Sequence, residues 1–354
     1  MKASRRYPSS IDVARLAGVS QSAVSRAFSE GKSVSEETSR KVFEAAKKLG
    51  YSPNLLPRIL KMHRSNLVAI VASGTDNPFY AAALQSFTRA LQELGYQVLL
   101  VQVDDDHSLD GVVPRLESYR VDAIVSALPV LSKEAAMALA DVRVPTISFN
   151  TPVRNRWVAA VCSDGAGGAA AVAKLFLRRG ARSFGFIAGS EGSHASSERL
   201  RGYVHTLHAR RIGGVSVVHG DYSYAGGYEA VLTLAKRGPI PEGIFSANDL
   251  MAIGALDALR HELGLKVPDD VLVAGFDDVP EASWKAYDLT TVLQDGAAMV
   301  AEAVAILQQM IAAPRSVGDI LRTVPGKLIE RATTQRETRA KTAGKRRGSG
   351  PSSR

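Results

Sequence analysis

The sequence has a single cysteine, Cys162, among its 354 residues. One thiol cannot form a disulfide within the chain, and it cannot by itself build a cysteine zinc site. The chain also lacks an apolar run of the ~18 to 20 residues that a membrane span needs. Its basic, polar N-terminal segment does not have the apolar stretch of a secretory signal. These absences predict a cytoplasmic protein with no membrane partner.

Motifs that mark enzymes are missing as well. The sequence contains no HExxH, GxSxG or P-loop motif, and its 7 histidines are scattered without the spacing of metal ligands. Gly165, Gly167 and Gly168 lack the order of a dinucleotide-binding loop, and the start of a helix explains them better. We therefore expect no catalytic residue, no metal and no cofactor.

Acidic residues are scarce at both ends of the chain. Residues 1–66 contain 13 Lys and Arg against 5 Asp and Glu, and residues 338–354 contain 6 against none. The part between them has 25 basic and 30 acidic residues. Basic ends favour a polyanion, because Lys and Arg release counterions from phosphates; ordinary surface charge is the alternative. The segment 338–354 is predicted to be a disordered tail, either inert or adding DNA affinity.

Residues 10–50 have the pattern of three short helices. Ser20 and Ser35 are favourable N-caps for the second and third helix. Gly18 and Gly50 are favourable stops, because glycine adopts the left-handed conformation that ends a helix. The expected helices cover residues 11–17, 21–29 and 36–49.

The first two of these helices are joined by a turn that crosses them steeply, as in a helix-turn-helix. The second helix would project its first side chains into a major groove, where glutamine can pair with adenine and arginine with guanine. A small helical hairpin without a DNA role is the alternative. The residues expected to contact DNA from this module are Ser20, Gln21, Ser22, Ser25 and Arg26.

From Leu67 onward, apolar strand candidates alternate with helical stretches. Continuous runs of Val, Ile and Leu are typical of buried parallel strands. Nine such strands in about 270 residues exceed one comfortable sheet, so the pattern predicts two doubly wound α/β lobes. The candidates are residues 67–72, 97–103, 121–127, 146–149, 158–162, 183–187, 215–218, 243–246 and 271–276.

The string from Asp12 to Arg26 resembles the DNA-binding module of the lactose-repressor/galactose-repressor (LacI) family of bacterial regulators. Further segments follow in the family's order over about residues 10–331. They are Asn77-Pro78-Phe79-Tyr80, Val121-Asp122-Ala123-Ile124, Glu198-Arg199-Leu200-Arg201-Gly202-Tyr203, Ala247-Asn248-Asp249, Gly275-Phe276-Asp277-Asp278 and Leu289-Thr290-Thr291-Val292.

The resemblance implies an all-α helix-turn-helix domain joined to a core of two doubly wound parallel-sheet lobes, like a periplasmic binding protein. We expect four parts along the chain. They are a DNA-binding domain (1–52), a hinge (53–66), a two-lobed core for effector binding and dimerisation (67–337) and the basic tail (338–354).

The resemblance also implies a hinge helix that folds on DNA and inserts a leucine into the minor groove. By position this leucine is Leu60, with Arg58 beside the phosphates and Asn54 at the start; an ordinary linker leucine is the alternative. Pro57 stands where the family usually has alanine. It disfavours helical geometry at Leu56, so the hinge helix starts later or is weaker than in the family.

A small-molecule cleft between the lobes is a further implication. Arg199 resembles the family's arginine that grips effector oxygens, and Asn248 and Asp277 follow strand candidates, where cleft residues belong. Such a set suits a sugar or a sugar acid. Capping of strand ends and a structural ion pair are the alternative roles. The expected effector contacts are Phe79, Arg199, Tyr222, Asn248, Asp277 and Gln294.

The sequence thus predicts a transcriptional regulator, most often a repressor in such families, whose affinity for double-stranded operator DNA is controlled by a small effector. A homodimer or larger assembly would present two recognition helices to a pseudo-palindromic site. A solute-binding protein would need a secretion signal and no recognition helix. An enzyme of sugar metabolism would need a catalytic constellation that the sequence does not offer.

Overall fold

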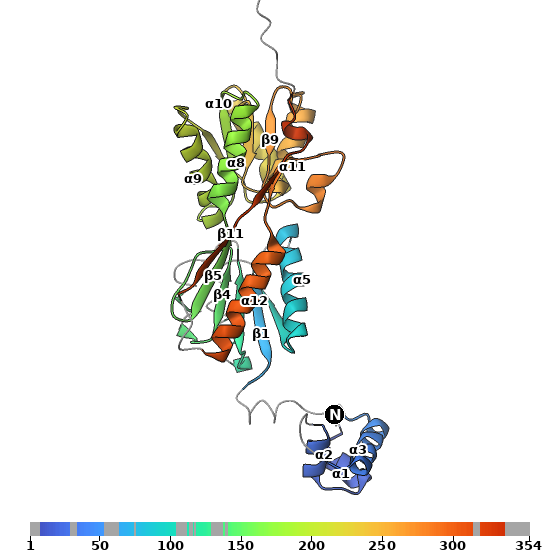
Figure 1. Ribbon diagram of the computed structural model, residues 1–354. Helices are drawn as coiled ribbons and strands as arrows, with labels where there is room; N and C mark the ends of the chain where they lie inside the picture. The colour runs from blue at the N-terminus through green and yellow to red at the C-terminus, as the bar shows by residue number, and fades with distance from the viewer. Residues whose placement is uncertain are drawn as a thin grey trace, which may run out of the picture. The chain divides into compact units, whose positions relative to one another are not determined.

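The computed structural model describes residues 8–28, 34–52, 64–73, 76–103, 112, 116, 118–128, 137–138, 141–313 and 319–336. The chain divides into two compact units, one comprising the first 65 residues and the other beginning at Asn66 (Figure 1). Each unit has a hydrophobic core of its own.

The first unit consists of the three predicted helices. They are α1 (Ser10–Ala17), α2 (Gln21–Ala27) and α3 (Glu36–Leu49). The predicted N-caps are confirmed, because the side chains of Ser20 and Ser35 accept hydrogen bonds from the third residue of their helices. Gly18 and Gly50 end α1 and α3 with left-handed φ angles of 66° and 62°.

A small core fixes the angle between these helices. Val13, Val24 and Val42, one from each helix, are at most 1% exposed and pack with alanines. Because the alanines are small, the helix backbones approach closely, as a steep crossing requires. Phe28 closes the core against Phe43, with ring centroids 5.0 Å apart in an edge-to-face contact.

Ser35→Ala is expected to destabilise the first turn of α3 by about 1 kcal/mol, the typical cost of losing an N-cap. The Ser35 hydroxyl accepts from the Thr38 amide at 3.3 Å, and alanine offers no replacement. Hydrogen exchange of the full chain should show about fivefold faster exchange of the amides in the first turn of α3. In Ser35→Asp, which restores an acceptor, the α3 amides should exchange as in the wild type. If these amides exchange equally slowly in the alanine variant, Ser35 does not stabilise α3 as an N-cap.

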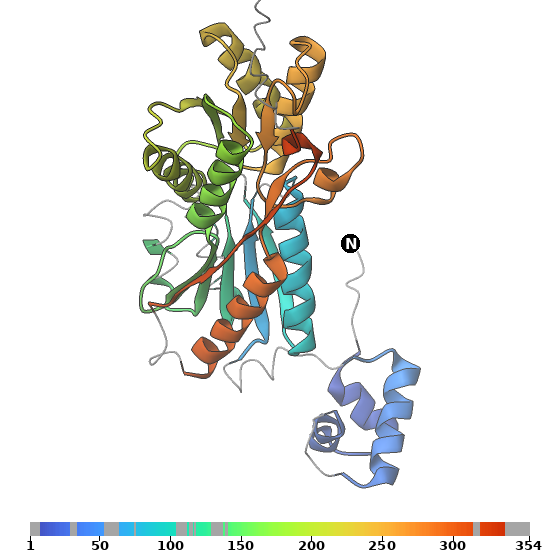
Figure 2. The ribbon, with the colours of Figure 1, turned by 45° about the horizontal axis from the view of Figure 1, so that its top comes forward.

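The second unit has an N-terminal lobe built on a parallel six-stranded sheet of order β11-β5-β4-β3-β1-β2. Helices α5 (Pro78–Glu93) and α12 (Gly296–Ala312) lie side by side over one face of this sheet (Figures 1 and 2). Their apolar side chains, among them Phe87 and Met299, pack on buried strand residues such as Ile70. The strands are β1 (Leu67–Ala72), β2 (Gln97–Gln102), β3 (Ala123–Ala127), β4 (Thr146–Phe149), β5 (Val158–Ser163) and β11 (Leu321–Val324).

The C-terminal lobe contains a parallel four-stranded sheet of order β7-β6-β8-β9 with helices around it. Its centre is an aromatic cluster in which Tyr203 contacts Phe176, Phe186 and Phe245. The strands are β6 (Phe184–Ala188), β7 (Ser216–His219), β8 (Gly243–Ser246) and β9 (Leu272–Ala274). The helices are α8 (Gly165–Arg178), α9 (His194–His208), α10 (Tyr224–Arg237) and α11 (Asp249–Asp257).

Within the described residues the chain passes between the lobes at three places. The passages follow β5 into α8, β10 (Thr291–Leu293) into α12, and β11 into β12 (Lys327–Ile329). Strands β10 and β12 pair antiparallel beside the C-terminal lobe. The lobes are therefore joined through a narrow waist, and the predicted two-lobe α/β core is confirmed.

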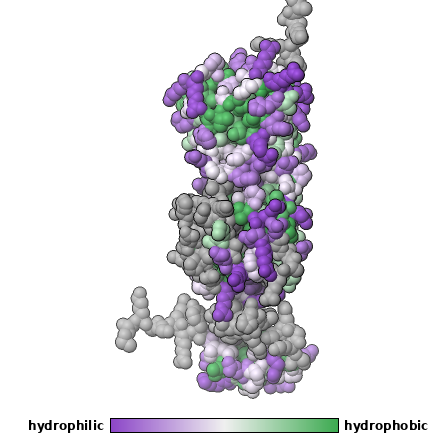
Figure 3. Space-filling view, turned by 90° about the vertical axis from the view of Figure 1, so that its left-hand side faces the viewer, coloured by the Kyte–Doolittle hydropathy of each residue, from purple (hydrophilic) through white to green (hydrophobic). Residues whose placement is uncertain are grey.

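None of the helices that the structure describes is long and apolar enough to cross a bilayer. Figure 3 shows one face of the molecule, on which hydrophilic side chains surround an apolar area of the C-terminal lobe. In this view the apolar side chains of that lobe form one continuous area.

Candidate DNA interface and ligand cleft

Helix α2 has one buried and one exposed face. Ala23 and Val24 are 8% and 1% exposed and pack into the helical core. The predicted contact residues lie on the other side, and the structure brings them together on one exposed surface. They are Ser20, Gln21, Ser22, Ser25 and Arg26.

Short-range hydrogen bonds order the start of this exposed face. The Ser20 hydroxyl accepts from the Ala23 amide at 3.2 Å and lies 2.9 Å from the Ser22 hydroxyl. The Gln21 side-chain amide donates to the hydroxyl of Ser10 in α1 at 3.0 Å. The amide is thus oriented before any partner arrives, which suits a side chain that must present a donor and an acceptor to one base.

The predicted hinge contacts Asn54, Arg58 and Leu60, together with Pro57, lie outside the described residues. The same holds for the basic tail 338–354. Their roles stay predictions.

A cavity of about 330 Å³ opens between the two lobes of the second unit. This volume lies at the lower end of the ~300 to 1,000 Å³ of small-molecule sites. The structure brings five of the six predicted effector contacts to its wall. They are Phe79, Arg199, Tyr222, Asp277 and Gln294.

Aromatic rings form two walls of the cavity. Phe79, near the start of α5, is held by Phe149 at a centroid distance of 6.2 Å and by Tyr80 at 5.3 Å. From the other lobe Tyr222 reaches over Gly189, where any side chain would clash with the tyrosine ring. The Tyr222 hydroxyl hydrogen-bonds to Ser193 at 2.5 Å, which fixes the ring.

Arg199 projects from α9 into the cleft and is 2% exposed. Its Nη1 donates to the carbonyl of Ala247, its Nη2 lies 3.8 Å from Asp277 Oδ1, and its guanidinium carbon stands 3.8 Å over the Phe276 ring. Its Nε is buried and has no hydrogen-bond partner among the residues that the structure describes. A buried donor without a partner costs free energy, so this N–H adds to the energetic cost of holding Arg199 in the cleft.

Asp277 belongs to a polar network that connects both lobes. Gln294 Nε2 donates to Asp277 Oδ1 at 2.5 Å, and Gln294 Oε1 accepts from Asn150 Nδ2 at 3.2 Å. The Asn77 side chain also hydrogen-bonds to Asp277. Burial raises the pKa of Asp277, while Arg199 acts in the opposite direction. A ligand that entered this network would contact both lobes at once.

Three cleft residues have left-handed backbone conformations that non-glycine residues rarely adopt. The φ angles are 65° at Asn150, 68° at Tyr222 and 124° at Asp277. Such conformations persist only where the surroundings enforce them, and they gather at functional sites.

Asn248 is the predicted effector contact that the structure does not place on the cavity wall. Its Oδ1 accepts from the Met251 amide at 3.0 Å and caps α11, and its Nδ2 donates to the Tyr222 carbonyl at 2.9 Å. It is 1% exposed. In this arrangement Asn248 caps the helix α11 and holds the backbone of Tyr222. Its expected contact with the effector stays a prediction.

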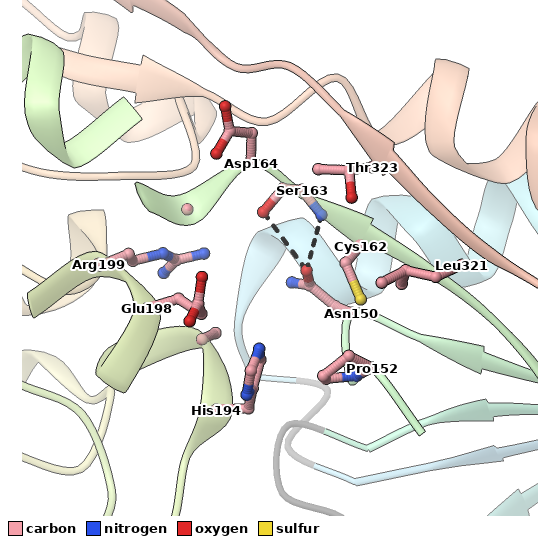
Figure 4. Close-up of a pocket in the computed structure, with 12 residues that line it drawn as sticks. Asn150, Pro152, Cys162, Ser163, Asp164, His194, Glu198, Arg199, Leu321 and Thr323 are labelled. Carbon is pink, nitrogen blue, oxygen red and sulfur yellow. Dashed lines mark hydrogen bonds between the residues drawn. The ribbon is translucent and has the colours of Figure 1, made fainter. Parts of the chain in front are cut away.

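A smaller chamber of about 110 Å³ adjoins the main cavity and shares Asn150 and Arg199 with it. Figure 4 shows Glu198 and His194 of α9 on one side and Cys162 and Thr323 of the N-terminal lobe on the other. Burial, with a smaller effect of Glu198, raises the pKa of Cys162 to about 12. The thiol is therefore protonated at neutral pH and unsuited to nucleophilic chemistry.

The sequence-based site omitted Asn77, Tyr80, Asn150 and Tyr224, which also line the cavity. Asn150 directly follows β4, which is the same signal that identified Asp277. Asn77 precedes Pro78 and caps α5, accepting from the Phe79 amide at 3.0 Å. Tyr224, in contrast, begins a helix and carried no signal.

Asp249 makes the stability of the core dependent on pH. Burial, followed by the nearby Asp277 carboxylate, raises the pKa of Asp249 to about 8. A raised carboxyl pKa stabilises the fold below the unfolded-state pKa of about 4. That contribution is lost as the pH rises toward the folded-state value.

We therefore expect the free energy of unfolding to fall between about pH 4 and pH 8, and Asp249→Asn to flatten that slope. Asparagine imitates the protonated acid and can keep the contacts with Thr291 (2.6 Å) and the Val279 amide (2.9 Å). Urea denaturation of both proteins across this range provides the measurement. Asp269→Asn, at an exposed carboxylate, is the control, and parallel pH profiles for wild type and Asp249→Asn would refute the assignment.

No group of three or more His, Cys, Asp or Glu side chains in the described part of the chain could hold a metal ion.

Comparisons with known proteins agree with both halves of this description. Residues 11–54 match the model for bacterial regulatory proteins of the lacI family, and residues 173–334 match a periplasmic binding protein-like domain. The transcriptional regulator AscG of Escherichia coli (strain K12) is 33% identical over 332 residues, which cover 91% of this chain and 96% of AscG.

Solved structures of regulators extend the similarity to the whole fold. The lac repressor dimer bound to operator and the anti-inducer ONPF has a TM-score of 0.84 at 26% identity, covering 93% of this chain and 99% of the repressor. The complex of the regulator CelR with cellobiose has a TM-score of 0.69 at 30% identity and covers 92% and 99% of the two chains.

Proposed function

The chain belongs to the lacI family of bacterial regulatory proteins, and from this premise we propose that it is a repressor whose affinity for operator DNA is set by a small hydroxylated ligand in the interlobe cleft. One observation carries the proposal. The same chain has an exposed recognition face on α2 and, in its second unit, a cavity lined by a polar network that reaches both lobes.

The DNA-binding role is assigned to the face of α2. We assign base contacts to Gln21 and Arg26, and backbone or base contacts to Ser20, Ser22 and Ser25. The exposure of these side chains and the caps that order the helix support the assignment. Asn54, Arg58 and Leu60 are proposed to add contacts from the hinge, on the strength of the family resemblance alone.

The ligand is proposed to be a carbohydrate. Aromatic walls suit the faces of a sugar ring, and carboxylate, amide and guanidinium groups suit its hydroxyls. Phe79 and Tyr222 supply the walls, and Arg199, Asp277 and Gln294 supply the polar contacts. CelR, a relative at 30% identity, was solved with cellobiose.

Ligand and DNA are proposed to act on each other through the lobes. A ligand that contacts both lobes favours one lobe arrangement, and thermodynamic linkage then requires a reciprocal effect on operator affinity. We propose a cytoplasmic homodimer divided into a DNA-binding domain (1–52), a hinge (53–66), a core (67–337) and a tail (338–354). Two recognition helices on a two-fold axis fit a pseudo-palindromic operator.

Selection from random DNA duplexes tests the proposed function. The full chain should enrich a pseudo-palindrome whose half-sites are about one helical turn apart, or a multiple of that. Enrichment of no sequence at low salt would overturn the DNA-binding role. A solute-binding protein or a sugar-metabolising enzyme, the alternatives from other classes, would give that negative result.

A further inference from the structure

Carboxylates outnumber cations around the described part of the cleft. Asp76, Asp221 and Asp277 line the main cavity, and Asp164 and Glu198 line the side chamber. Against these five acids, the lining residues described include no lysine and a single arginine, Arg199; His194 is the remaining basic side chain. Glu198 forms an ion pair with Arg201 of the same helix at 2.5 Å, and Asp277 lies next to Arg199. The negative balance of the site therefore comes from Asp76, Asp164 and Asp221.

The charge of Arg199 already has a partner. Its Nη2 lies 3.8 Å from Asp277 Oδ1, and both side chains are 3% exposed. A ligand carboxylate that bound this guanidinium would be buried next to Asp277 as well, and two like charges in a poorly solvated site repel strongly. A hydroxyl or ring oxygen that reached the Arg199 side chain at the cavity wall would bring no charge next to Asp277.

The other two acids of the main cavity reinforce this preference. Hydrogen bonds from the Ser223 hydroxyl (2.5 Å) and amide (2.9 Å) lower the pKa of Asp221, so it is ionised at neutral pH. Both bonds use Oδ1, which leaves Oδ2 for a ligand. Asp76, on the N-terminal lobe, is exposed. An anion entering the cleft would meet carboxylates from both lobes.

We propose that the effector carries no negative charge, and that it is an uncharged sugar or an amino sugar rather than a sugar acid or a sugar phosphate. This inference rests on the proposed role of the cleft as the effector site. The walls formed by Phe79 and Tyr222 accept an uncharged ring, and their faces also attract an ammonium group. The two alternatives that the sequence left open, sugar and sugar acid, are thereby separated by charge.

Calorimetry of the full chain with matched ligands tests the proposal. The panel contains aldopentoses, aldohexoses and glucose disaccharides, each hexose together with its 2-amino, uronate and 6-phosphate derivatives. At least one uncharged or amino sugar should bind, and its acidic counterparts should bind at least about tenfold more weakly, a difference of roughly 1.4 kcal/mol. Equal or tighter binding of an acid, or no binding by any uncharged or amino sugar, would overturn the proposal.

Two variants show whether the named carboxylates cause the discrimination. At low salt, the double variant Asp76→Asn/Asp221→Asn should bring the dissociation constants of the neutral sugar and its uronate closer together. Asp269→Asn should leave the ratio of these two constants as in the wild type. An unchanged ratio in the double variant would overturn the assignment. The DNA-binding role is tested by operator selection in the absence of sugar. It therefore stands even if acidic sugars bind as tightly as neutral ones.

Discussion

Asp277→Ala is expected to abolish the effector response and to destabilise the core by about 3 to 5 kcal/mol, the usual cost of removing one partner from a buried charge pair. Arg199 would remain 2% exposed without its carboxylate. Gln294 would lose the acceptor of its 2.5 Å hydrogen bond. The ligand would then lose the network through which it contacts both lobes.

Two measurements separate the loss of ligand binding from the loss of folding. Urea denaturation gives the stability, and calorimetry with the sugar identified in the panel gives the affinity. Asp277→Asn is the matched variant, because its side-chain oxygen can still accept from Gln294. It should lose less stability than the alanine variant and should still bind operator in the absence of sugar. Wild-type sugar affinity in Asp277→Ala would show that the cleft is assigned wrongly.

Arg26→Ala is expected to weaken specific operator binding by about 1 to 3 kcal/mol, or roughly 5- to 150-fold. Arg26 is exposed in the last turn of α2, and an arginine there can donate two hydrogen bonds to the major-groove edge of guanine. Fluorescence anisotropy with the selected operator and with single base-pair variants provides the measurement. The variant should no longer distinguish between base pairs at one position of each half-site and should still distinguish between them at the others.

Arg40→Ala is the matched control for the Arg26 variant. It removes the same charge from the same unit, but from an exposed position on α3. Any loss of DNA affinity in this variant should be the same for every DNA sequence and should become smaller as salt is added. A positive charge near the DNA backbone attracts phosphates, which carry no sequence information. Unaltered base discrimination in Arg26→Ala would remove Arg26 from the proposed base contacts.

The helical unit was predictable because local chemistry determines it. Ser20 and Ser35 cap helices through hydrogen bonds that span three residues, and Gly18 and Gly50 end helices through their own backbone angles. None of these effects needs a distant partner. The unpredicted cap at Ser9, which forms a reciprocal pair with Asp12, is equally local, and the sequence pattern could have revealed it.

The strands show where such predictability ends. Each of the nine expected strands is present, and their ends differ by up to two residues. The three short strands β10, β11 and β12 were not expected. They contain three or four residues each, with polar side chains such as Arg322 and Lys327. Their partner strands lie far along the chain, so these strands form only through tertiary contacts. A search for local apolar runs in the sequence therefore does not predict them.

The cleft was predictable to the extent that parallel strands end there. Asn150, Asn248 and Asp277 all follow strands, and this signal places each of them near the same sheet edges. It does not tell which of them reaches the cavity. The Asn248 amide turns to the Met251 amide and the Tyr222 carbonyl, whereas Asn150 and Asp277 line the cavity wall. Only side-chain packing decides between these outcomes.

The most direct test of the account measures the sugar affinity of the full chain with and without its selected operator. If the cleft controls the DNA-binding face, the operator must change the dissociation constant of the sugar by the same factor by which the sugar changes that of the operator. Factors of about 5 to 150 are typical of such coupling. Identical sugar affinity in the two titrations would mean that the cleft and the recognition helix do not communicate.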